Sequence, residues 1–112
     1  MSELVYLSGP ITGIDNYEEN FSKAEKKLKL MGYRVCNPVI LGKEVENDLK
    51  KLNRSPTWKD YMVKCMEKIF NCDAIYMLPG WENSRGAKIE REIAIGCEMK
   101  FISVLNTSVA RF

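Results

Sequence analysis

Short segments typical of buried β-strands alternate with amphipathic helical segments along this chain, and no other feature of the sequence constrains the fold as strongly. The segments with strand character are residues 4–7, 33–36, 74–78 and 101–105. This alternation predicts right-handed βαβ crossovers, and hence a parallel sheet of about four strands with helices on both faces. We therefore expect a three-layer α/β domain of the Rossmann-like or flavodoxin-like type.

Three segments between these strands have the apolar spacing of helices. The first helix is expected to begin at Asp15 or Asn16, to end at Gly32, and to bury Tyr17, Phe21, Ala24, Leu28 and Met31. The second begins at Thr57, in capping-box spacing with Asp60, and is expected to bury Trp58, Tyr61, Met62, Cys65, Ile69 and Cys72. The third covers residues 84–99. Residues 39–56 are highly charged without a persistent period, so we expect a long loop there with one helical turn at most.

Size and charge limit the possible classes of protein. The 112 residues, 46% hydrophobic and 29% charged, predict one globular domain over residues 1–112. A core of this size is modest, so we expect a homodimer or a larger homo-oligomer. Basic and acidic residues alternate at a net charge of +2, which argues against a nucleic-acid polymer as partner. No signal segment and no apolar run of roughly 20 residues is present, so we expect a cytoplasmic protein without membrane contact.

The chain contains no histidine, and this excludes several kinds of chemistry. Its cysteines are Cys36, Cys65, Cys72 and Cys97, and they form no C-x-x-C motif. The usual zinc sites and every Ser-His or Cys-His nucleophile pair are therefore excluded. We expect no metal and no cofactor, and any acid–base chemistry must use carboxylates, tyrosine or lysine.

Two loops are the candidates for ligand binding, because ligands of such sheets bind beyond the carboxyl ends of the strands. The first loop offers glycines and hydroxyl groups that suit a phosphate or a sugar hydroxyl, at Ser8, Gly9, Pro10, Thr12 and Gly13. It matches neither a P-loop nor G-x-G-x-x-G, so a tight turn without a ligand is the alternative.

The second loop, residues 79–86, leads directly into a helix. The hydroxyl of Ser84 and the first N–H groups of that helix form a potential anion site, to which Arg85 adds a positive charge. Trp81 either stacks on a base or covers the edge of the core.

Glu90 is the most informative single residue. A helical projection places it on the apolar stripe formed by Gly86, Ala87, Ile93, Ala94 and Cys97. An unpaired buried carboxylate would cost several kcal/mol, so its surroundings must supply hydrogen bonds or shift its pKa, as at functional carboxylates. The alternative is a structural glutamate satisfied by a lysine or by loop N–H groups. Asp73, at the start of the third strand, is assigned a structural hydrogen bond.

These motifs together resemble the nucleoside 2-deoxyribosyltransferase-like superfamily, in particular its branch of small, often phage-encoded proteins grouped as DUF4406. The resemblance covers nearly the whole chain and is most specific over residues 80–87 with Glu90. It also includes residues 6–13, Asn37-Pro38, residues 58–62, Cys72-Asp73, residues 78–79 and Ala94.

The resemblance implies cleavage of the N-glycosidic bond of deoxynucleosides or their monophosphates, with Glu90 as the nucleophile on the anomeric carbon. It implies that Tyr6 lies near this nucleophile, that Ser84 and Gly86 hold a 5′-phosphate, and that residues 8–13 face the sugar and phosphate. Water or another base would then release the sugar from the covalent intermediate. The resemblance further implies dimers or larger assemblies in which a neighbouring chain completes each site.

Two positions depart from the pattern of those enzymes. Cys65 stands where they have an acidic residue that assists the departing base, and no carboxylate replaces it on that helix face. Tyr61, one turn before Cys65, is the candidate proton donor. Thr12 stands where the hydrolases have an arginine in the phosphate loop, and Arg85 is the candidate to compensate.

Three hypotheses about function follow. The preferred one is an enzyme that hydrolyses or exchanges the N-glycosidic bond of a nucleoside or nucleotide, with Glu90 as nucleophile and Tyr6 or Tyr61 as positioning group or proton donor. The main alternative is a nucleotide sensor or scavenger without turnover, which Cys65 favours. The third is an interaction module whose partner surface comprises Ile89, Ile95 and Met99.

Overall fold

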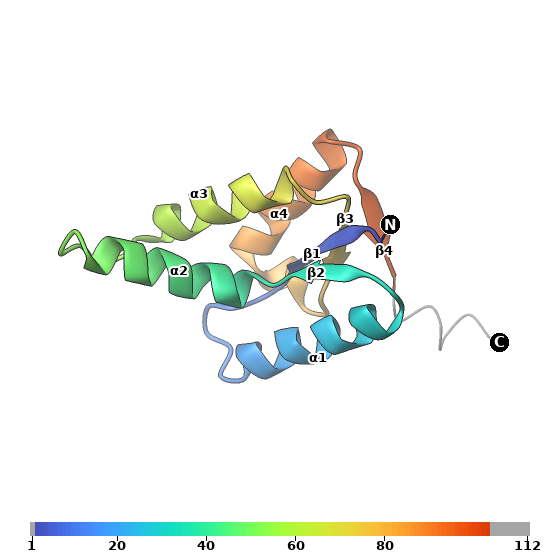
Figure 1. Cartoon of the computed structure of the whole chain (residues 1–112), viewed down its shortest axis with the longest axis horizontal. Helices are drawn as coiled ribbons and strands as arrows, with labels where there is room; N and C mark the ends of the chain where they lie inside the picture. The colour runs from blue at the N-terminus through green and yellow to red at the C-terminus, as the bar shows by residue number, and fades with distance from the viewer. Residues whose placement is uncertain (1, 104–112) are drawn as a thin grey trace.

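The computed structural model describes residues 2–103 of the chain. Helices and strands follow one another in the order β1 (Leu4–Ser8), α1 (Tyr17–Leu30), β2 (Arg34–Cys36), α2 (Pro38–Lys50), α3 (Trp58–Ile69), β3 (Ala74–Met77), the 3-10 helix η1 (Trp81–Asn83), α4 (Arg85–Gly96) and β4 (Lys100–Ile102) (Figure 1). In this part of the chain no helix is both long enough and apolar enough to cross a membrane.

The four strands form one parallel sheet in the order β2-β1-β3-β4. Tyr6 in the central strand β1 is aligned with Cys36 of β2 and with Ile75 of β3. This topology confirms the predicted Rossmann-like or flavodoxin-like class, and it puts the switch in strand order between β1 and β3. The predicted last strand ran to residue 105, and its residues 104 and 105 lie outside the described part of the chain.

Alternating side chains of the central strands build a core on each face of the sheet. Val5 and Leu7 point to one face, where Phe21 and Leu28 of α1 cover them. Tyr6 and Ile75 point to the other face and pack with residues of three helices, namely Leu41, Ile69 and Ala94. Figure 1 shows the resulting layers, with α1 on one side of the sheet and α3 and α4 on the other. The period-two pattern of strand residues therefore decides which side chains face α4.

Residues 38–50 form the helix α2, so the prediction of a long loop over residues 39–56 was wrong. The side chain of Asn37 caps this helix by accepting a hydrogen bond from the N–H of Val39 at 3.0 Å, and Pro38 occupies the first turn. Leu41 and Val45 lie one turn apart and are both buried. Asn followed by Pro is a typical helix start, but here it also ends a strand and was interpreted only in that way.

The predicted helix boundaries hold in part. The Thr57–Asp60 capping box is confirmed, with the N–H of Thr57 donating to Asp60 at 2.8 Å. Asn16 precedes α1, but its side chain makes no capping hydrogen bond. Met31 follows the last turn of α1 and is exposed, and Cys97 follows the last turn of α4 and is also exposed. These two predictions of burial were wrong because a helical projection continues past the point where the helix ends.

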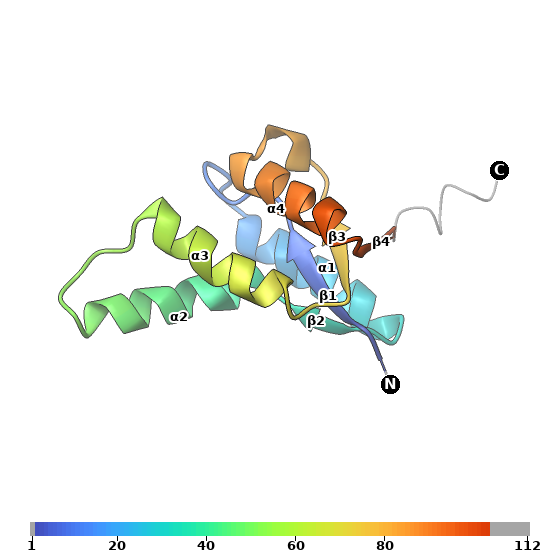
Figure 2. The ribbon, with the colours of Figure 1, turned by 90° about the horizontal axis from the view of Figure 1, so that it is seen from above.

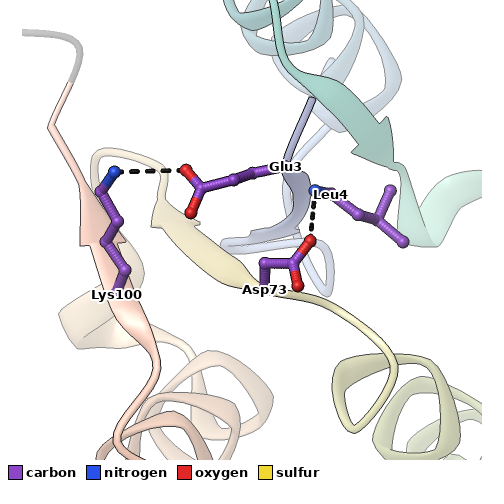
Figure 3. A network of polar contacts seen from close by, with 4 residues as sticks. All are labelled: Glu3, Leu4, Asp73 and Lys100. Carbon is purple, nitrogen blue, oxygen red and sulfur yellow. Dashed lines mark hydrogen bonds and ion pairs between the residues drawn. The ribbon is translucent and has the colours of Figure 1, made fainter. Parts of the chain in front are cut away.

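The amino ends of the strands are joined by polar contacts at the surface (Figure 3). The N–H of Leu4 donates to Asp73 Oδ2 at 2.8 Å, and the N–H of Asp73 donates to the backbone oxygen of Leu4 at 2.8 Å. Lys100 Nζ of β4 lies 3.2 Å from Glu3 Oε1. The assignment of Asp73 to a structural hydrogen bond is thus confirmed, at the end of the sheet opposite to the predicted ligand.

Candidate functional site

A cavity of about 1110 Å³ lies at the carboxyl ends of β1 and β3. Its walls come from the loop after β1, the start of α1, α2 as far as Glu46, α3 as far as Cys65, the turn after β3 and the start of α4. Figure 2 shows the hairpin of α2 and α3 extending well beyond the strands. The hairpin therefore supplies one wall of a cavity at the switch in strand order, where ligands of such sheets bind.

Glu90 of α4 lies at the base of this cavity and is only 6% exposed. The hydroxyl of Tyr6 donates to Glu90 Oε2 at 2.8 Å, and the hydroxyl of Ser8 donates to Oε1 at 2.7 Å. Tyr6 and Ser8 are alternate residues of β1, so both point to the face that α4 covers. The small buried side chains of Ala87 and Ala94 flank Glu90 one turn away on either side and allow the helix to approach the sheet closely.

Two opposing effects act on the Glu90 carboxyl. Burial raises its pKa above the usual range, because the charged form loses water. The hydroxyls of Ser8 and Tyr6 and the nearby thiol of Cys65 act in the opposite direction, and burial outweighs them. A carboxylate has about four lone-pair positions, and the two hydroxyls occupy one on each oxygen. Glu90 is thereby oriented, and each of its oxygens keeps one lone pair for a ligand.

The two groups beside Glu90 hold their own protons tightly. Burial, and next the charge of Glu90, raises the pKa of Tyr6 well above its ordinary value. The same two causes raise the pKa of Cys65, on α3, to about 12. Both groups are therefore protonated at neutral pH, so that Tyr6 donates its hydrogen bond to Glu90 and neither group is a strong acid or a nucleophile.

The start of α4 brings a cation and a helix end to the cavity. Ser84 caps α4, and its Oγ accepts a hydrogen bond from the N–H of Ala87 at 3.1 Å. The guanidinium of Arg85 lies over the ring of Trp58, 4.0 Å from its centroid. Ser84, Arg85 and Gly86 all line the cavity. This wall can accept an anionic group, because it combines a helix N-terminus with a guanidinium.

Comparison with known protein families identifies the chain. Residues 3–103 match the family described as "Domain of unknown function (DUF4406)". The chain belongs to the DUF4406 family. The match extends from the start of β1 to the end of β4, and so it includes Tyr6, Ser8, Cys65 and Glu90. No curated protein and no solved structure matches the chain.

In the first loop of this DUF4406 domain, Gly9, Pro10 and Thr12 line the cavity. A side chain at Gly9 would meet the Cβ of Leu78 at 2.7 Å, so glycine lets this loop lie against the end of β3. Ser8 is fully buried and contacts Glu90 instead of facing the open cavity, as does Tyr6. In the described residues Gly13 lies outside the lining, with a left-handed φ of +79° that serves the turn.

Two aromatic candidates have different surroundings from those expected. Trp81 lies outside the lining of the described cavity, and the guanidinium of Arg91 stands 4.9 Å from its ring centroid. Tyr61 lines the cavity, but its hydroxyl donates to Glu46 Oε2 of α2 at 3.1 Å. The structure therefore places Tyr61 in the wall formed by the hairpin and does not pair it with Glu90.

The structure adds site residues that sequence reasoning missed. Trp58, expected in the core, is 40% exposed and lines the cavity. Lys43 and Glu46 of α2 and Glu18 of α1 also line it, and Lys43 Nζ lies 3.8 Å from Glu18 Oε2. The signal that could have revealed the α2 residues is the helix start at Asn37-Pro38, followed by apolar residues one turn apart.

Proposed function

We propose that this protein cleaves the N-glycosidic bond of a ribo- or deoxyribonucleoside or its 5′-monophosphate, by hydrolysis or by base exchange, with Glu90 as the nucleophile. The observation that carries the proposal is a single buried carboxylate at the base of a cavity, held through both oxygens by Tyr6 and Ser8. No cation of the described residues pairs with this carboxylate, so its ionised form is available to an electron-poor carbon. The proposal also rests on the resemblance to the nucleoside 2-deoxyribosyltransferase-like superfamily.

In the proposed reaction a free lone pair of Glu90 attacks the anomeric carbon as the base departs. The hydroxyls of Tyr6 and Ser8 keep the carboxylate in one orientation, which places the nucleophile without reorganisation. Water or a second base then attacks the same carbon and releases Glu90. Tyr61 lines the same cavity, with its hydroxyl on Glu46, and in this scheme it is the candidate proton donor and not a positioning group for Glu90.

The other end of the ligand is assigned to the start of α4 and to the loop after β1. Ser84, Arg85 and the free N–H groups of α4 would hold a 5′-phosphate, since a helix N-terminus and a guanidinium both favour an anion. Pro10 and Thr12 of the loop after β1 also line the cavity and would face the sugar.

A second candidate function is nucleotide binding without turnover, as in a sensor or a scavenger. The observation that favours it is Cys65, whose pKa of about 12 makes it a poor proton donor to a departing base. In that case Glu90 would accept hydrogen bonds from the ligand, and the cavity would retain its specificity.

We also propose that the protein forms a homodimer or a larger homo-oligomer. Ile89 and Ile95 are 38% and 46% exposed on α4, the helix that carries Glu90, and would form a surface for a neighbouring chain. Analytical ultracentrifugation of the wild type and of Ile95→Glu tests this, with a monomeric wild type as the contradicting result.

The proposed function is tested by incubating the protein with ribo- and deoxyribonucleosides and their 5′-monophosphates and measuring free base by chromatography. Base release that disappears in Glu90→Ala supports a glycosidase or a transferase. No release, together with a rise in melting temperature on adding one nucleotide, supports the binding protein. No release and no stabilisation by any compound contradicts both.

A further inference from the structure

We infer that the site is built for N-glycosides whose base carries a positive charge, such as a pyridinium or an N7-alkylated purine, and that it releases the base without giving it a proton. This inference rests on the proposed glycosidase function and names its substrate class. The inference follows from two features of the described cavity lining, namely the lack of a second carboxylic acid near Glu90 and the excess of carboxylates over cations.

The charge of the base decides whether a proton donor is needed. When the bond between the anomeric carbon and a neutral base breaks, the electron pair goes to the ring nitrogen and the base leaves as an anion. A general acid speeds this departure by protonating the base, and such donors typically contribute about 100-fold to 10,000-fold in rate. When the base is cationic, the same electron pair neutralises the ring, and the base leaves as a neutral molecule.

The described lining of the cavity holds no carboxylic acid placed for that task. Its carboxylates are Glu18, Glu46 and Glu90, and the last is the nucleophile. Glu18 and Glu46 are exposed side chains at the rim, engaged with Lys43 and with the hydroxyl of Tyr61. Neither is in contact with Glu90, whose two oxygens accept only from Tyr6 and Ser8 in the described structure.

The groups that do surround Glu90 keep their protons. Tyr6 has a pKa well above its ordinary value and Cys65 has a pKa of about 12, and both shifts come first from burial. Tyr61 also has a raised pKa, and its hydroxyl points to Glu46 instead of into the base of the cavity. A departing purine or pyrimidine anion would therefore find only weak acids within reach.

The same cavity favours a cationic ring. Among its described lining residues the carboxylates outnumber the two cations, Lys43 and Arg85, by one, and Lys43 is already paired with Glu18. Trp58 is 40% exposed and lines the cavity, and the guanidinium of Arg85 over one face of its ring, 4.0 Å from the centroid, shows that the ring attracts a flat cation. With Arg85 engaged by the 5′-phosphate, Glu46 and Glu90 remain to balance the positive charge of a bound base.

Burial of Glu90 assists this reaction in particular. The carboxylate and the cationic substrate lose their opposite charges as the new bond to the anomeric carbon forms, which yields a neutral glycosyl ester and a neutral base. A water-poor site disfavours separated charges, so the change toward neutral products is easier there than in water. Water then attacks the anomeric carbon, Glu90 leaves as the carboxylate, and the proton of the water passes to solvent. The sum is a cationic nucleoside plus water giving base, free sugar and one proton.

The test uses two substrates that differ by one methyl group. Guanosine is neutral and 7-methylguanosine is cationic, and both are assayed with ribose and with deoxyribose, with and without a 5′-phosphate; nicotinamide riboside is a second cationic probe. Free base is measured by chromatography, and each rate is divided by the spontaneous rate of the same compound. We expect an acceleration at least about 100-fold greater for the cationic member of the pair, and we expect it to disappear in Glu90→Gln.

Two variants of Cys65 with side chains of equal size test whether the lack of a proton donor causes the preference for a cationic base. Cys65→Asp adds a carboxyl group beside Glu90, and Cys65→Asn adds a group of the same size that does not ionise. We expect Cys65→Asp to reduce the preference for 7-methylguanosine by at least about tenfold, through faster release of guanine. Cys65→Asn should keep the preference of the wild type.

The outcomes separate this inference from the function on which it rests. Equal acceleration of guanosine and 7-methylguanosine, dependent on Glu90, would overturn the inference and leave the glycosidase intact. Release from none of these compounds, nor from other nucleosides, would overturn both. Preference for the cationic substrates, reduced by Cys65→Asp and kept by Cys65→Asn, supports both.

Discussion

The two ends of the parallel sheet use carboxylates in opposite ways. At the carboxyl end, Glu90 is buried and receives hydrogen bonds from the hydroxyls of Tyr6 and Ser8. At the amino end, Asp73 accepts from the backbone N–H of Leu4 at the surface, and exposed Glu3 pairs with Lys100 (Figure 3). Carboxylates thus stabilise the strand ends at the amino end of the sheet, and a carboxylate forms the candidate site at the carboxyl end.

Solvent and the type of donor account for this difference. Water screens the carboxylates of the amino end, so they carry charge at little cost and stabilise the strand ends only modestly. Glu90 is shielded from water and its donors are neutral. Loss of solvation destabilises the charged form more than these hydrogen bonds stabilise it, so the pKa of Glu90 rises. Buried carboxylates with shifted pKa values are concentrated at functional sites, and this is why Glu90, rather than the carboxylates of the amino end, is the candidate nucleophile.

Neutralising each carboxylate in turn should give the largest contrast between the two ends. Glu90→Gln keeps the size of the side chain and removes the nucleophile, so we expect base release to fall by about 1,000-fold or more. Asp73→Asn, the matched change at the amino end, should leave the rate within about twofold, since it lies far from the cavity. The rates are measured by chromatography of free base. Similar losses in both variants would mean that Glu90 acts only through folding.

The second contrast is in pH dependence. Turnover requires ionised Glu90, whose pKa is raised, so the rate should fall about tenfold per pH unit below that pKa. Stability should change in the opposite direction. The folded state binds the Glu90 proton more tightly than the unfolded state, so this contribution to stability is complete at low pH and is lost as the pH rises through the raised pKa.

This pH effect is measured by urea unfolding of the wild type and of Glu90→Gln at several pH values. The free energy of unfolding of the wild type should decrease relative to the variant as the pH rises above the usual carboxyl range. A constant difference between the two proteins would contradict a raised pKa at Glu90.

Removing one donor from Glu90 should have a moderate effect. Tyr6→Phe leaves Oε2 without its hydrogen bond in a buried place, so we expect the free energy of unfolding to fall by about 1–3 kcal/mol at neutral pH. Tyr76→Phe is the matched control, because Tyr76 lies on the adjacent strand and faces α1. That variant should change stability by less than about 0.5 kcal/mol. Equal losses, measured by urea unfolding, would assign the effect to packing of the ring.

The smallest effect is expected at the surface of the amino end. Glu3→Gln removes the partner of Lys100, whose pKa is raised by the hydrogen bond and charge of Glu3. The pair is exposed, so we expect a melting temperature indistinguishable from that of the wild type at physiological salt. A clear drop in calorimetry, removed by added salt, would show that this end of the sheet depends on charge more than its exposure suggests.

Local patterns in the sequence were sufficient for most of the scaffold. The strands, their parallel arrangement and the position of Glu90 on the apolar stripe of its helix follow from periodicity and from the alternation of strands with helices, whereas the strand order β2-β1-β3-β4 came from the structure. The helix α2 was not predicted from these patterns. Its cap at Asn37-Pro38 coincides with a strand end, and many charged residues separate its buried residues. The site residues Lys43 and Glu46 were missed with it.

The partners of Glu90 were decided by tertiary structure alone. Tyr6 and Ser8 lie 84 and 82 residues away from Glu90 in the sequence, and only the packing of α4 on β1 brings their hydroxyls to its two oxygens. Tyr61 and Trp81 were candidate site residues from the sequence, but neither forms a hydrogen bond with Glu90 in the described part of the structure. The hydroxyl of Tyr61 donates to Glu46, and the ring of Trp81 lies under the guanidinium of Arg91. Periodicity depends on neighbours along the chain and so determines which face a side chain occupies, while its partner depends on what packs against that face.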